Sequence, residues 1–110
     1  MAENNTQRPP IFLFTDGASS GNPGPGGYGV VLKCAGKELE MSGGFSLTTN
    51  NRMELLAVIK GLEAIRWVNA EVHVYSDSSY VTGTVNNIKN VVNHLGNDFN
   101  QLGTDLHVFK

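Results

Sequence analysis

The chain has 110 residues, a length that suits one small domain. Eight Lys and Arg residues against ten Asp and Glu residues give a formal net charge of −2. This charge argues against a protein that binds DNA mainly through electrostatic attraction. The single cysteine, Cys34, excludes an internal disulfide framework and favours a reducing compartment. The apolar runs are too short to span a membrane and the N-terminus has no apolar signal region, so we expect a soluble, cytoplasmic protein.

The N-terminal third predicts a tail, a strand and a glycine-rich loop. Residues 1–10 are polar and end in Pro-Pro, so we expect a flexible tail before a single domain over 11–110. Residues 11–15 form a continuous apolar run of strand length, which the dipeptide Asp16-Gly17 ends. The glycines and prolines of 21–27 predict an irregular loop.

The middle of the chain predicts a hairpin followed by a helix and another strand. Residues 28–34 and 38–45 are expected to form antiparallel strands joined by a turn at 35–37. Apolar residues with a helical period predict an amphipathic helix over 51–67. Residues 71–76 then alternate as a fourth strand.

The last third predicts a second helix and a fifth strand. Apolar positions recur at helical spacing over 81–95, and Gly96 ends the helix. Residues 97–103 leave room for one further turn, and 106–110 form a short strand. The order β-β-β-α-β-α-β predicts an α/β fold with a mixed five-stranded sheet and helices against its faces.

Three carboxylates stand where predicted elements begin or end. Asp16 ends the first strand, Glu54 lies in the first helical turn, and Asp77 ends the fourth strand. Ligands of open α/β sheets bind beyond the carboxyl ends of the strands, and carboxylates gathered there suit Mg²⁺ or Mn²⁺. Each acid also has a structural interpretation: a turn at Asp16-Gly17, a capping box between Asn51 and Glu54, and a helix cap at Asp77. Spacing alone leaves both interpretations open.

Other polar residues predict little chemistry. The glycine-rich loop lacks the Lys-Ser/Thr of a phosphate-binding P-loop and leads into a strand. The histidines have no metal-ligand spacing, and those in strands are expected to be structural. Cys34 is expected to be a small buried residue, and the serines after Asp77 are expected to cap a helix. The histidines are His73, His94 and His107, and the serines are Ser78 and Ser79.

Three segments resemble motifs of the bacterial type-1 ribonuclease H family, in that family's order and spacing. They are the opening stretch TDGASSGNPGPGGYG at 15–29, the stretch TTNNRMEL at 48–55, and YSDSSYV at 75–81. The resemblance covers residues 11 to about 85 and is weak beyond Thr82. The order of elements expected from periodicity agrees with that family's fold.

The resemblance implies a metal-dependent endonuclease that hydrolyses the RNA strand of RNA–DNA hybrids with Mg²⁺ or Mn²⁺. It implies that Asp16, Glu54 and Asp77 are catalytic metal ligands. It also implies contacts to the hybrid from a second set, which is Asn22, Thr49, Asn50, Asn51, Ser79 and Tyr80. Neutral Asn and Thr donors suit a shallow minor groove in which 2′-hydroxyls distinguish RNA from DNA.

The sequence also departs from the family pattern. The family continues with a loop carrying a histidine and a final helix carrying a fourth aspartate, and neither is in this sequence. Asp105 precedes the fifth strand, at the opposite edge from the site, and is not a substitute. We therefore expect a ribonuclease H-like domain without the final helix, and a homodimer formed through the exposed C-terminal edge. A non-catalytic nucleic-acid-binding module and a fragment with a structural role remain alternatives.

Overall fold

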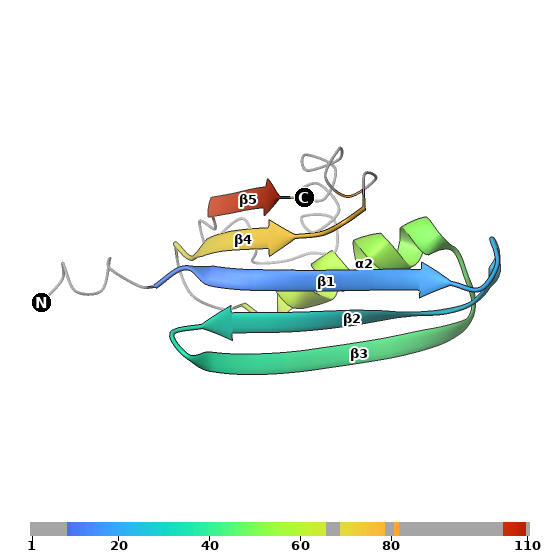
Figure 1. Cartoon of the computed structure of the whole chain (residues 1–110), viewed down its shortest axis with the longest axis horizontal. Helices are drawn as coiled ribbons and strands as arrows, with labels where there is room; N and C mark the ends of the chain where they lie inside the picture. Colours follow the sequence, from blue (N-terminus) through green and yellow to red (C-terminus); the bar gives the residue numbers. More distant parts are fainter. Residues whose placement is uncertain (1–8, 66–68, 79–80, 82–104, 110) are drawn as a thin grey trace, which may run out of the picture.

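The computed structural model describes residues 9–65, 69–78, 81 and 105–109. Its centre is one five-stranded sheet with the spatial order β3-β2-β1-β4-β5 (Figure 1). The hairpin strands β2 and β3 extend the sheet from β1 in antiparallel fashion, whereas β4 and β5 run parallel to β1. The expected mixed sheet is confirmed. The strands are β1 (Ile11–Ser19), β2 (Gly24–Cys34), β3 (Lys37–Thr48), β4 (Glu71–Tyr75) and β5 (Asp105–Phe109).

The first hairpin is longer than the sequence pattern predicts. β1 continues past Asp16 to Ser19, and β2 already begins at Gly24. The expected irregular loop over 21–27 is therefore wrong for residues 24–27, which belong to β2. Glycines permit this close pairing, since a Cβ on Gly26 would lie 2.6 Å from the carbonyl oxygen of Ala18. Asp16 therefore lies inside a strand, and its interpretation as a turn residue is wrong.

The turn between β2 and β3 is confirmed, although it is shorter than predicted. Ala35 and Gly36 both have positive φ, at 52° and 82°, and β3 starts directly after them at Lys37. This left-handed backbone suits Gly36, and Ala35 is the unusual member of the pair. The tight turn keeps β3 antiparallel to β2 along its whole length.

The helix α2 (Asn50–Glu63) confirms the predicted helix but has different ends. Its N-cap is Thr49, whose hydroxyl accepts a hydrogen bond from the Arg52 N–H at 3.2 Å. The expected capping box between Asn51 and Glu54 is therefore wrong, and Glu54 lies in the second helical turn. At the other end, Ala64 caps the helix with bonds to carbonyls of the last turn.

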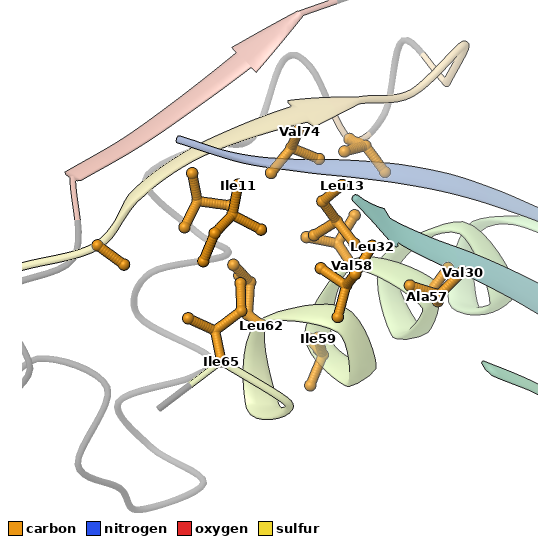
Figure 2. Close-up of a cluster of buried hydrophobic side chains, with 13 residues drawn as sticks. Ile11, Leu13, Val30, Leu32, Ala57, Val58, Ile59, Leu62, Ile65 and Val74 are labelled. Atoms are coloured by element: carbon orange, nitrogen blue, oxygen red, sulfur yellow. The ribbon is translucent and has the colours of Figure 1, made fainter. Parts of the chain in front are cut away.

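The core lies between α2 and the face of the sheet that carries every second residue of β1, β2 and β4. Figure 2 shows Leu13 and Val74 from the strands pointing toward Val58 and Leu62 of the helix. The helix approaches closely because Gly61 has no side chain: a Cβ there would lie 2.4 Å from Leu13 Cδ1. This packing sets the distance of α2 from β1, and with it the place of the helix's N-terminal turns.

The opposite face of β1, β4 and β5 carries a row of aromatic and imidazole rings. Tyr75 stacks between Phe14 and Phe109, with ring centroids 5.1 and 5.2 Å apart. His73 and His107 stack at 5.2 Å, which agrees with the structural role expected of these strand histidines. Such ring pairs add to the cross-strand stability of a sheet.

Several predicted features lie outside the described residues. They are the tail over 1–8, the end of the first predicted helix over 66–68, His94, and almost all of the second helix and the turn after it. Val81, the one described residue of that helix, is helical and buried. β5 starts at Asp105, one residue earlier than predicted, and that residue pairs with Glu71 at the amino end of β4. No helix in the described part of the chain is long and apolar enough to cross a membrane.

Candidate active site at the carboxyl ends of β1 and β4

A backbone contact between β1 and α2 brings the strand that carries Asp16 against the helix that carries Glu54. The contact is at Gly17, where a Cβ would lie 2.5 Å from the carbonyl carbon of Met53 and 2.7 Å from the Glu54 nitrogen. Only glycine fits such a close approach. Asp16 is exposed and Glu54 is half-buried. The two acids therefore leave the backbone at neighbouring points of one edge.

Asp77 reaches the same edge because β4 runs parallel to β1. Phe14 pairs with Tyr75 in the register of the two strands, and the Thr15 hydroxyl donates to the Tyr75 carbonyl at 3.4 Å. Asp77 lies two residues beyond the end of β4 and is exposed. The parallel register thus places it beside the carboxyl half of β1, close to Asp16 along the chain direction.

The predicted helix cap at Asp77 is taken by its neighbour. The Ser78 hydroxyl accepts from the Val81 N–H at 3.2 Å, and the Ser78 N–H donates to the Ser76 hydroxyl at 3.1 Å. This is the i to i+3 bond expected of an N-cap serine. The capping role predicted for Ser78 is confirmed, and Asp77 is not needed for it.

The three carboxylates suit a hard divalent cation by their chemistry. Within the described ranges, none of them forms an ion pair or accepts a hydrogen bond. Carboxylate oxygens without protein donors are the ligands that Mg²⁺ and Mn²⁺ prefer. The geometry is only partly in place, because no three acidic, histidine or cysteine side chains among the described residues are gathered tightly enough to hold a metal.

Two hydrogen bonds tie the end of β1 and the β1–β2 loop to the start of α2. The Ser19 N–H donates to Asn50 Oδ1 at 2.8 Å, and the Asn50 N–H donates to Asn22 Oδ1 at 2.9 Å. The Ser19 hydroxyl lies 3.3 Å from the same Asn22 oxygen and also contacts the Gly21 carbonyl oxygen. The structure thus brings two of the predicted hybrid-binding residues together, one helical turn from Glu54.

The other predicted contact residues have different outcomes. Thr49 is half-buried and caps α2, while Asn51 is exposed in its first turn. Ser79 and Tyr80 lie outside the described residues. The contact of the Ser19 N–H with Asn50 was not predicted, because the two residues are 31 positions apart and no spacing rule links them.

A hollow of about 530 Å³ opens beside Asp16 on the sheet face opposite α2. Its walls come from three strands, with Phe14 on β1 and Glu40 and Ser42 on β3. Gly29 on β2 pairs with Asp16 and leaves the floor open, because a Cβ there would meet no atom within 4 Å. The Asp16 carboxylate therefore borders open space large enough for a substrate group.

Cys34 lies at the far end of the sheet from this edge. It is half-buried, and its thiol contacts the Pro9 carbonyl oxygen at 3.9 Å. Burial raises the pKa of the Cys34 thiol above its ordinary value of 9.0. A thiol that resists deprotonation is a poor nucleophile. Cys34 packs against the core as expected, but it is half-buried and not buried.

Comparison with known proteins gives consistent results. The RNase H family model matches residues 8–106. A ribonuclease H of Syntrophus aciditrophicus is 57% identical over 76 residues, which are 69% of this chain and 43% of that protein. A ribonuclease H of Trichodesmium erythraeum is 53% identical over 85 residues, which are 77% of this chain and 52% of that protein.

Solved structures agree with the sequence matches. The chain is similar to LC11-RNase H1 in a crystal structure with an RNA/DNA hybrid, with a TM-score of 0.72 and 29% identity. That match covers 90% of this chain and 83% of the other. In sequence, by contrast, the chain spans about half the length of the curated relatives it matches.

Proposed function

The chain belongs to the ribonuclease H family, and we propose that it is a divalent-metal-dependent endonuclease that cleaves the RNA strand of RNA–DNA hybrids. The observation that carries the proposal is the contact of Gly17 with Glu54, together with the hydrogen bond from Asn50 to Asn22 at the start of the same helix. Through them, the acids that would hold metal and the amides that would hold substrate share one edge. LC11-RNase H1, a relative of the same fold, binds such a hybrid.

Asp16, Glu54 and Asp77 would hold the metal in this proposal. A bound divalent ion supplies an activated water and stabilises the leaving oxygen of the phosphodiester. The chain's own contribution is placement: Gly17 keeps the helix carrying Glu54 against β1, and the parallel register keeps Asp77 beside it. None of the three carboxylates forms an ion pair within the described residues, so they are available to a metal.

Substrate binding would come from neutral donors more than from charge. Asn22 and Asn50 lie exposed beside the start of α2, with Asn51 and Thr49 in the same turn. A net charge of −2 allows few phosphate contacts, so affinity would be modest and would depend weakly on salt. Hybrid would bind more tightly than a DNA duplex of the same sequence, because DNA lacks the 2′-hydroxyl.

Cleavage of a labelled RNA–DNA hybrid tests the proposal. The assay compares Mg²⁺, Mn²⁺ and EDTA, with DNA and RNA duplexes of the same sequence as substrate controls. Metal-dependent cutting of the hybrid's RNA strand alone supports the enzyme. Hybrid binding without cutting under any metal would favour the alternative of a non-catalytic binding module.

A homodimer through β5 is a separate proposal. β5 is the last strand in the order of the described sheet, and Phe109 on it is 40% exposed. Strand edges with exposed aromatic residues tend to pair with a second chain. Light scattering at micromolar concentration tests this, and a species of only 11.9 kDa would contradict it.

A further inference from the structure

The strand β3 forms an open edge of the sheet, at the other end of the strand order from β5 (Figure 1). It is the longest strand of the described sheet, with 12 residues, whereas β5 has five. Its pairing with β2 is regular from Lys37 to Phe45, and the register shifts only between Gly24 and Gly26 of β2. Within the described sheet, no strand pairs with the outer side of this regular part, so its outward backbone groups are available to another strand.

The side of β3 that faces α2 is apolar and poorly covered. Leu39 pairs with the buried Leu32, and Met41 pairs with the buried Val30, so both lie on the α2 side of the sheet. Helix α2 packs over β1 and β2 and barely touches β3. As a result, Leu39 is 50% exposed, and Phe45 on the same side is 49% exposed.

Leu39 and Phe45 each border a hollow between β3 and the helix side of the sheet. The hollow beside Leu39 has a volume of about 490 Å³ and reaches to Ile65. The hollow beside Phe45 has a volume of about 260 Å³ and is also lined by Leu56 and Ile59 of α2. Apolar side chains and hollows next to an open strand edge are typical of a surface that contacts another protein chain.

The distribution of charge along β3 limits how a second strand can pair with it. From Leu39 to Phe45, the α2 side carries no charged residue and no proline, the residues that protect strand edges from pairing. Glu38 and Glu40 are the only charged residues of 38–46, and they lie on the other face. If the partner is a second copy, registers that align Glu40 with Glu40 or with Glu38 are disfavoured by like-charge repulsion.

Antiparallel pairing of two β3 strands centred on Ser42 avoids this repulsion. It places Leu39 of each copy opposite Phe45 of the other, so the half-exposed apolar side chains gain apolar neighbours. The two glutamates of each copy lie opposite Gly44 and Ser46, which are uncharged. The regular part of β3 is therefore complementary to itself, both in charge and in the placement of its large side chains.

We propose that β3 is a homodimer interface, in which it pairs antiparallel with β3 of a second copy of this chain in the register centred on Ser42. The two-fold axis of such a pair is perpendicular to the sheet, so the two sheets become continuous and both α2 helices lie on the same side. Phe45 of each copy then faces the hollow beside Leu39 of the other. This interface is independent of the proposed nuclease function and of the separate edge at β5.

Sedimentation equilibrium over about 1 to 200 µM tests the association, and the parent should approach twice the 11.9 kDa of one chain. Leu39→Glu and Phe45→Lys each place a charge opposite an apolar side chain, twice in the symmetric pair. We expect each variant to raise the dimer Kd about tenfold or more. Because both side chains are half exposed, the variants should melt close to the parent at the lowest concentration, where all are monomers.

The double variant Leu39→Glu/Phe45→Lys tests the register. In the pairing centred on Ser42, the introduced carboxylate of each copy lies opposite the introduced ammonium of the other. We therefore expect the Kd to return to within about threefold of the parent value. An equimolar mixture of the two single variants should also associate more tightly than either variant alone, because one such ion pair forms in the mixed dimer. Other registers leave the introduced charges unmatched.

Hydrogen exchange locates the interface without any substitution. Amide protons within residues 38–46 should exchange more slowly at high than at low protein concentration, because pairing protects the outward N–H groups of β3. Phe109→Lys is the matched control, since it adds a charge to a 40% exposed side chain on the opposite edge strand. Association through β3 should persist in this variant.

Three outcomes would overturn the inference. The first is a parent that stays at 11.9 kDa at every concentration. The second is association that Phe109→Lys abolishes and the two β3 variants leave unchanged, which would place the contact at β5. The third is loss of association in both single variants without recovery in the double variant, which would exclude the register centred on Ser42.

Discussion

Gly17 of β1 and Glu54 of α2 touch through their backbones, and no side chain fits between them. A Cβ added to Gly17 would lie 2.7 Å from the Glu54 nitrogen and 2.5 Å from the Met53 carbonyl oxygen. The distance from the strand to the helix therefore also determines how Asp16 and Glu54 lie relative to each other. Stability and the candidate site depend on the same contact.

Gly17→Ala should therefore destabilise the fold and misplace the acids together. The clash is with backbone atoms, which cannot turn away as a side chain can, so we expect a loss of about 1–3 kcal/mol in unfolding free energy. Chemical denaturation measures this loss, and metal-dependent cleavage should fall in the same variant.

Gly29→Ala is the matched control for stability. Gly29 lies in the neighbouring strand opposite Asp16, and a Cβ there meets no atom within 4 Å. We expect this variant to be as stable as the parent, or more stable by up to about 1 kcal/mol, because alanine restricts the unfolded chain. Equal effects of the two substitutions would refute the close-contact explanation.

Thr49→Ala should weaken the N-terminus of α2. The Thr49 hydroxyl accepts from the Arg52 N–H at 3.2 Å, and loss of an N-cap oxygen costs about 1 kcal/mol. Thr49→Ser should restore the stability. Asn51→Ala tests the capping box that the sequence predicts, and it should leave the melting temperature within a degree or two of the parent value, since Asn51 is not the cap. A larger loss from Asn51→Ala than from Thr49→Ala would reverse this assignment.

The sheet could be predicted because its signals are local. Alternating or continuous apolar runs identify all five strands, and the helical period identifies α2. The ends of these elements could not be predicted equally well. β1 continues through Asp16-Gly17 because the glycines opposite it in β2 can approach closely, and that pairing partner is not visible in a local pattern.

The candidate site, like the fold, could be predicted from the sequence only in part. The three acids and the asparagines follow from motif resemblance, and the structure places the described members at one edge. The hydrogen bond from the Ser19 N–H to Asn50 could not be predicted, because it joins two elements that are 31 residues apart in the sequence. The capping assignments at Asn51 and Asp77 failed because Thr49 and Ser78, each with a hydroxyl three residues before the bonded N–H, serve instead.

The stability of the domain should fall at alkaline pH in part through Cys34. Because burial raises the pKa of this thiol, the unfolded chain loses the thiol proton at a lower pH than the folded chain. The stabilising contribution is complete below the ordinary pKa of 9.0 and is lost as the pH rises through the folded value. Urea unfolding of the parent and of Cys34→Ala across pH 7 to about 10.5 isolates the effect. Parallel pH profiles of the two proteins would be inconsistent with it.

Asp16→Asn should abolish cleavage while leaving the metal-free protein at least as stable as the parent. Asp16 accepts no hydrogen bond and forms no ion pair within the described residues, so its charge contributes no contact to the fold. In the parent, Mg²⁺ or Mn²⁺ at ten times its Kd should add about 1.4 kcal/mol to the free energy of unfolding by binding only the folded state, and this gain should be lost in Asp16→Asn.

Glu38→Gln is the control, because it removes an acid whose exposed ion pair with Lys33 is worth little. Thermal melts with and without metal measure all three proteins. If Asp16→Asn cut hybrid at the parent's rate, or melted far below the parent without metal, Asp16 would be a structural residue of β1 and not a metal ligand.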